Sequence, residues 1–107
     1  MAIGIARDKD RYQIKIEGEM TIFVAQELKE ALTEPLQSAS EIEVDLSQVT
    51  EIDSAGLQLM LLAKNESKQR GTNIRFIEHS SPVQDILDLT DMVAFFGDPV
   101  VIPSQSH

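Results

Sequence analysis

The chain has 107 residues, 42% of them hydrophobic, which is enough for one domain with a single core. Nine basic against eighteen acidic residues give a net charge of −9, which disfavours binding to nucleic acid and to anionic membranes. With no cysteine and no apolar run near the roughly 20 residues of a membrane helix, the composition predicts a cytoplasmic protein without disulfides or membrane insertion.

The first residues alternate apolar and polar side chains, which is typical of strands with one exposed face. We expect a short strand around residues 3–5, a charged turn over 8–11, and a second strand over 12–16 that Gly18 ends. A β-hairpin therefore opens the predicted fold.

A helix is predicted next, because apolar residues recur after Thr21 at helical spacing. Thr21 is a suitable N-cap, and Pro35 should stop or kink the helix at the residue before it. Residues 37–40 are predicted to form a loop, and residues 42–46 a buried strand.

The clearest signals for helix and strand ends follow this strand. Residues 47–50 are expected to connect it to a helix over 54–69, which Gly71 ends at a C′ position. Another strand is predicted over 73–78, and two strands that flank a helix of this length form a right-handed parallel crossover by default. The sequence thus predicts an α/β fold, a single domain over 1–107. Its mixed sheet has four to five strands, a central βαβ crossover, and helices packed mainly on one face.

The C-terminal part carries weaker patterns. Ser81 and Pro82 fit the N-cap and first position of a short helix. Asp91 is a candidate cap for a further turn, residues 100–102 could add an edge strand, and residues 103–107 are expected to be a frayed polar tail.

The central helix has two different faces when its residues are placed at 100° intervals. One face carries small residues that allow close packing on a sheet, and we assign it to the core: Gly56, Leu59, Met60, Ala63 and Ser67. The opposite face mixes leucine with uncharged polar residues: Ser54, Gln58, Leu61 and Asn65, flanked by Leu57, Leu62, Lys68 and Gln69. Such a face suits a protein-binding patch if it is exposed, whereas other helices could instead cover its leucines.

Ser54 stands at the junction of strand and helix, where unpaired N–H groups and the helix dipole favour an anionic group. One interpretation is that Ser54 is only the N-cap of the helix, a role that Asp53 could also fill. The other is that Ser54 is a regulatory phosphorylation site, because a phosphate adds about −1.5 to −2 charge units. Asp53 would repel that phosphate, so the new charge should act mainly on whatever docks there.

Catalytic and metal chemistry find little support in the sequence. Ser54 is not in a G-x-S-x-G elbow, and His79 has no evident carboxylate partner. The acidic residues near the C-terminus are not spaced as a calcium loop, and no phosphate-cradling glycine loop is present. We therefore expect a protein that is not an enzyme and needs no metal or cofactor.

A family signature is visible in residues 45–57, whose sequence is DLSQVTEIDSAGL. It resembles that of the STAS domains, the family of bacterial anti-sigma factor antagonists, and the likeness extends to a turn over 18–20 and to Gly71. The resemblance implies a small α/β domain that binds an anti-sigma factor, a serine kinase of the histidine-kinase-like fold. In that family the kinase phosphorylates the serine that corresponds to Ser54 and releases the complex, and a phosphatase restores binding.

The helical faces and the resemblance together predict a partner-binding surface made of Thr21, Asp53, Ser54, Ala55, Gln58, Leu61 and Leu62. One departure from the family pattern is Thr21, which stands where many antagonists have an aspartate. It leaves two alternatives open: a STAS component of a chemotaxis-linked or other phosphorelay, or a constitutive STAS subunit of a lipid-transport ATPase assembly.

Overall fold

A computed structural model describes residues 2–90 of the chain, and within them four strands and three helices. The elements are, in chain order, β1 (Ala2–Asp8), β2 (Arg11–Met20), α1 (Ala25–Ser38), β3 (Glu41–Ile52), α2 (Ser54–Arg70), β4 (Asn73–Ile77) and α3 (Ser81–Leu89). The strands form one sheet in the order β1-β2-β3-β4, with β1 antiparallel to β2 and the other two pairs parallel. The predicted mixed sheet and its central β3-α2-β4 crossover are confirmed.

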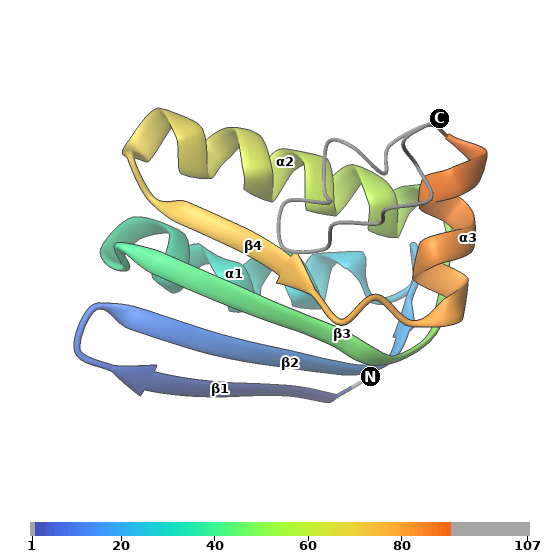
Figure 1. The fold of residues 1–107 in the computed structure, drawn as a ribbon, viewed down its shortest axis with the longest axis horizontal. Helices are drawn as coiled ribbons and strands as arrows, with labels where there is room; N and C mark the ends of the chain where they lie inside the picture. The colour runs from blue at the N-terminus through green and yellow to red at the C-terminus, as the bar shows by residue number, and fades with distance from the viewer. Residues whose placement is uncertain (1, 91–107) are drawn as a thin grey trace, which may run out of the picture.

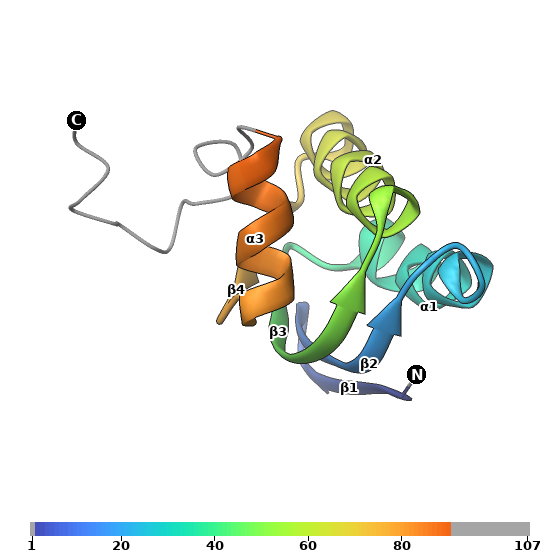
Figure 2. The ribbon, with the colours of Figure 1, turned by 90° about the vertical axis from the view of Figure 1, so that its right-hand side faces the viewer.

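The molecule has a layer of helices on one face of a curved sheet (Figures 1 and 2). Helices α1 and α2 lie side by side over this face, and α3 packs against β3 at one end. The opposite face of the sheet is polar and carries ion pairs between neighbouring strands, Arg11 with Glu41 and Arg75 with Glu43. The arrangement agrees with the prediction of helices on mainly one face.

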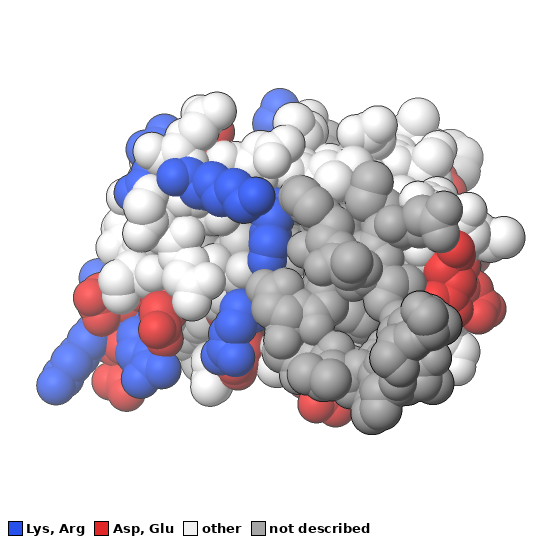
Figure 3. Space-filling model, turned by 45° about the horizontal axis from the view of Figure 1, so that its top comes forward, with Lys and Arg blue, Asp and Glu red and all other residues white. Residues whose placement is uncertain are grey.

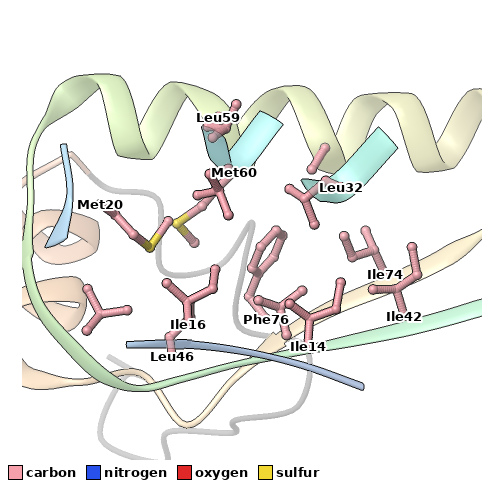
Figure 4. Packing of buried hydrophobic residues seen from close by; sticks show 14 of the residues in the cluster. Ile14, Ile16, Met20, Leu32, Ile42, Leu46, Leu59, Met60, Ile74 and Phe76 are labelled. Atoms are coloured by element: carbon pink, nitrogen blue, oxygen red, sulfur yellow. The ribbon is translucent and has the colours of Figure 1, made fainter. Parts of the chain in front are cut away.

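The core lies between the sheet and the helices α1 and α2. Strands β2, β3 and β4 bury alternate residues, as the alternation predicts: Tyr12, Ile14, Ile16, Ile42, Val44, Leu46, Ile74 and Phe76. Figure 4 shows several of these side chains facing Leu32 of α1 and Leu59 and Met60 of α2. Each buried aliphatic side chain stabilises the fold by roughly 1.5–3 kcal/mol, so this core fixes α2 on the sheet.

Strand β2 continues beyond Gly18, and the prediction that Gly18 ends it is wrong. Gly18 has a φ of 99°, a left-handed conformation that glycine adopts at little cost, and the strand runs through it to Met20. The ladder between β2 and β3 shifts register twice, and β3 has one extra residue at each shift. These bulges keep β3 paired through residues 47–50, predicted to be a connector, as far as Ile52.

Helix α1 begins later than predicted. Its first residue is Ala25, and Val24 occupies the N-cap position without a side-chain hydrogen bond. Thr21 is therefore not the N-cap. Its carbonyl instead accepts a hydrogen bond of 3.0 Å from the N–H of Val24, which closes a turn between β2 and α1.

The same helix also ends later than predicted, because Pro35 does not stop it. Pro35 is buried on the same helical face as Leu28 and Leu32, and the helix continues to Ser38. Packing of this apolar face outweighs the loss of one main-chain hydrogen bond at the proline. The loop predicted over 37–40 is correspondingly shorter.

Helix α3 confirms the predicted short helix, with its N-cap displaced by one residue. Ser80, not Ser81, is the N-cap, because its main chain is extended and its carbonyl accepts a bond of 2.8 Å from the fourth residue after it. The predictions for Asp91, for a strand over 100–102 and for a tail over 103–107 lie outside the described residues.

Candidate functional site

Ser54 is the first residue of α2 and is exposed to solvent. A single residue, Asp53, separates it from the end of β3 at Ile52, so the predicted strand-to-helix junction is confirmed. The buried strand and the packed helix fix the position of Ser54 on the surface.

Asp53 is the N-cap of α2. Its main chain is extended, and its Oδ1 accepts hydrogen bonds from the N–H groups of Ala55 at 2.9 Å and Gly56 at 3.1 Å. Of the two cap candidates in the sequence, Asp53 is therefore the cap and Ser54 is not. No hydrogen bond joins the Ser54 hydroxyl to any residue between 2 and 90, which leaves it available for chemistry.

Asp53 also holds the segment between β2 and α1. Its Oδ2 accepts a hydrogen bond of 3.0 Å from the N–H of Ile22, and its own N–H donates to the carbonyl of Met20 at 3.3 Å. Desolvation raises the pKa of Asp53, but the N–H groups of Ile22, Gly56 and Ala55 together outweigh it and lower the pKa below its ordinary value. The carboxylate is thus ionised at neutral pH and links the turn at Ile22 to the start of α2.

Gly56 allows α2 to approach the sheet closely. A Cβ atom at this position would lie 2.2 Å from the carbonyl oxygen of Met20 and 2.9 Å from Cγ1 of Ile52, and both distances are too short for any side chain. The other residues assigned to this face, Leu59, Met60, Ala63 and Ser67, are buried as well. The predicted small-residue packing face of α2 is confirmed.

The opposite face of α2 is partly exposed. Ser54, Gln58 and Asn65 are exposed, Leu61 is half-buried, and Leu62 is 56% exposed. Two predicted residues lie differently in the structure: the flanking Leu57 is buried, and so is Thr21, only 5% of whose surface is exposed. The buried Thr21 hydroxyl has no hydrogen-bond partner in residues 2–90.

Two exposed apolar residues beside this face were not singled out in the sequence. Phe23 is 91% exposed and Ile22 is 66% exposed, and both lie in the turn that Asp53 holds. Both fall within the first turn of the helix that the sequence predicts after Thr21. Neither residue lies on the same helical face as the buried Leu28. This mismatch in spacing could have indicated that both side chains are exposed.

His79 makes no described contact with the residues around Ser54. Its Nε2 lies 2.9 Å from the carbonyl oxygen of Phe76, the last buried residue of β4.

Residues 2–90 contain no cluster of three or more His, Cys, Asp or Glu side chains that could hold a metal ion. None of the helices in this range is long and apolar enough to cross a membrane.

Comparison with known proteins gives matches over most of the chain. The model of the family described as "Mlab, STAS domain" matches residues 3–97. An anti-sigma-B factor antagonist of Staphylococcus epidermidis is 27% identical over 84 residues, which are 78% of this chain and 78% of that protein. The chain is thus similar to a protein named for antagonism of an anti-sigma factor, a binding function.

Solved structures of such antagonists share the fold. An anti-sigma factor antagonist from Mycobacterium paratuberculosis has a TM-score of 0.78 at 18% identity, over 89% of this chain and 81% of that one. The antagonist SpoIIAA in its unphosphorylated form has a TM-score of 0.73 at 14% identity, over 85% and 82% of the two chains. Its phosphorylated form, from Bacillus, has a TM-score of 0.70 at 12% identity, over 87% and 86%.

Proposed function

We propose that this chain, which belongs to the STAS domain family, is a protein-binding module of the anti-sigma factor antagonist type that phosphorylation of Ser54 regulates. The observation that carries the proposal is the exposed Ser54 hydroxyl at the start of α2, free because Asp53 is the N-cap. The similarity to antagonists named for this role supports it.

The physical basis of the switch is the charge that phosphorylation adds. Unphosphorylated Ser54 borders exposed Gln58 and half-buried Leu61, a mixed surface that a partner can cover at a small desolvation cost. A phosphate adds about −1.5 to −2 charge units, and covering it would require the loss of its hydration. The partner is therefore released.

Asp53 strengthens the effect of the phosphate on the partner. Its carboxylate already occupies the N–H groups of Ala55 and Gly56, the groups that would otherwise stabilise an anion at the start of α2. A phosphate on Ser54 meets a second negative charge instead of free donors, so the fold cannot neutralise it. The added charge then acts on the partner.

The proposed partner is an anti-sigma factor that is itself a serine kinase of the histidine-kinase-like fold. It binds the unphosphorylated chain and transfers phosphate from ATP to Ser54, and a phosphatase removes the phosphate and restores binding. Because the kinase requires ATP, the cycle operates in the cytoplasm. The chain itself contributes a surface and an acceptor hydroxyl and catalyses no step.

The test is to incubate the chain with ATP and the serine kinase encoded beside its gene, and to map the product by mass spectrometry. Modification is expected at Ser54 and is expected to be lost in Ser54→Ala. Binding of the kinase should be retained by Ser54→Ala and weakened in Ser54→Asp. Absence of phosphate at Ser54, or equal affinities of the two variants, would overturn the regulatory part of the proposal.

A second candidate function is a constitutive subunit of a larger assembly, such as a lipid-transport ATPase. The observation in its favour is the exposure of three large apolar residues, namely Ile22 and Phe23 in the turn beside Ser54 and Leu62 farther along α2, because apolar area is typical of permanent interfaces. This alternative predicts stable co-purification with a partner that neither Ser54→Ala nor Ser54→Asp alters.

A further inference from the structure

The turn between β2 and α1 presents two large apolar side chains to solvent. Phe23 is 91% exposed and Ile22 is 66% exposed, whereas the fold buries Met20 immediately before them. Adjacent exposed residues of this size are a common feature of interaction sites, and aromatic side chains are enriched among the residues that dominate binding energy. We call this pair, Ile22 and Phe23, the apolar anchor.

The apolar anchor is held in a defined position. The N–H of Ile22 donates to Oδ2 of Asp53 at 3.0 Å, and the turn is closed by the bond between Val24 and Thr21. The anchor therefore stands next to Ser54, the residue that follows Asp53, on the same end of the molecule. Because its main chain is fixed before binding, little conformational entropy is lost when a partner covers it.

The charge around the apolar anchor has one sign. Residues 17–28 and 46–58, which include the paired ends of β2 and β3 and the start of α2, contain acidic residues but no lysine or arginine. Glu19 and Glu51 pair directly in the ladder between β2 and β3, both are exposed, and neither forms an ion pair with any residue in 2–90. Figure 3 shows basic side chains over the C-terminal half of α2.

These two unpaired carboxylates favour a partner of opposite charge. Like charges on neighbouring strands repel each other, and lysine or arginine from a bound protein would relieve that repulsion. An anionic membrane, the other common acceptor for an exposed phenylalanine, would be repelled by the same carboxylates.

We propose that the apolar anchor inserts into an apolar pocket of a partner protein and that lysine or arginine side chains around that pocket face Glu19 and Glu51. The inference rests on the proposed function, since it specifies the chemistry of the partner that docks at Ser54. It assigns the main binding contribution to Phe23, and orientation and association rate to the two carboxylates.

The test measures binding of the full chain to the neighbouring serine kinase in the presence of ADP, so that no phosphate is transferred. Phe23→Ala should weaken binding by about tenfold or more. Leu89→Ala is the matched control: Leu89 is 85% exposed on α3, and its replacement should change affinity by less than about twofold. The double variant Glu19→Gln, Glu51→Gln should lower the association rate and its dependence on salt.

Each outcome separates the inference from the proposed function. If the kinase binds the native chain and Phe23→Ala equally well, the inference is overturned and the proposed function stands. Binding to phosphatidylglycerol vesicles that Phe23→Ala abolishes would replace the protein partner with a membrane and would also overturn it.

If the kinase does not bind the native chain, the proposed partner is wrong, and cross-linking decides the inference. The photo-reactive residue p-benzoylphenylalanine is placed at position 23, or at position 89 as control, in the full chain in its native cells. A cross-link from position 23 to an apolar protein surface flanked by lysine or arginine, mapped by mass spectrometry, supports the inference. No cross-link from position 23, or one to a surface without these features, overturns it.

Discussion

The N–H of Ile22 and the carboxylate of Asp53 are joined by a hydrogen bond of 3.0 Å across 31 residues of sequence. The same carboxylate caps α2 through Ala55 and Gly56. One side chain thus fixes both the turn that bears Phe23 and the helix end that bears Ser54. Replacement of Asp53 should therefore affect stability and surface structure together.

Asp53→Ala removes two cap hydrogen bonds and the bond to Ile22. We expect the free energy of unfolding to fall by about 1–2 kcal/mol, as for the loss of other N-caps, measured by urea denaturation. Asp53→Asn is the informative control, because its amide oxygen can still cap α2 while its NH2 group, a donor, cannot accept the N–H of Ile22. Equal stability of native and Asp53→Ala chains would contradict the role of Asp53 as the cap.

The lowered pKa of Asp53 predicts how stability depends on pH. The folded state favours the ionised carboxylate, so its contribution is fully present above the unfolded-state pKa of about 3.9 and is lost as pH falls through the lower folded-state pKa. The stability difference between the native chain and Asp53→Asn should therefore shrink below about pH 4. If the stability difference between the two chains instead stays constant between about pH 3 and about pH 7, this would argue against an ionised cap.

Phosphorylation of Ser54 should raise the pKa of Asp53 relative to the unmodified chain. The two groups are adjacent at the start of α2, and a neighbouring negative charge disfavours the ionised carboxylate. The titration can be followed by NMR through the side-chain carboxyl carbon of Asp53. The Ser54→Ala chain, which cannot be phosphorylated at this position, gives the reference titration of Asp53. A pKa of Asp53 that phosphorylation leaves unchanged would place the phosphate away from Asp53.

Gly56→Ala should destabilise the fold by about 1–3 kcal/mol, because the new methyl group would lie 2.2 Å from the Met20 carbonyl oxygen, a main-chain atom that cannot easily move. Gly4→Ala provides the matched control, since no atom lies within 4 Å of its added Cβ. Thermal unfolding of the two variants should show a clear loss for the first and little change for the second.

Much of the fold could be predicted because it follows from local patterns. Alternation located the strands, and the small-residue face of α2 predicted its contact with the sheet through Gly56. The errors arise where tertiary packing outweighs local preference. Pro35 remains in α1 because its face is buried, and bulges keep β3 paired to Ile52.

The candidate site could be predicted only in part for a similar reason. The position of Ser54 follows from the order of strand and helix, which the sequence contains. The cap depends on the main-chain angles of Asp53, and the exposure of Phe23 depends on a turn held by a contact 31 residues away in sequence. Long-range contacts of this kind leave no periodic signal.

The single residue between β3 and α2 has a consequence for how a signal can leave this molecule. A link as short as Asp53 leaves no hinge between the central strand and the helix, and Gly56 holds that helix against Met20. A partner that docks at Ser54, as we propose, therefore meets a helix end whose position on the sheet is fixed. Under the proposed function, phosphorylation of Ser54 would therefore act on the partner through its added charge on an unchanged shape, and not through a movement of the domain.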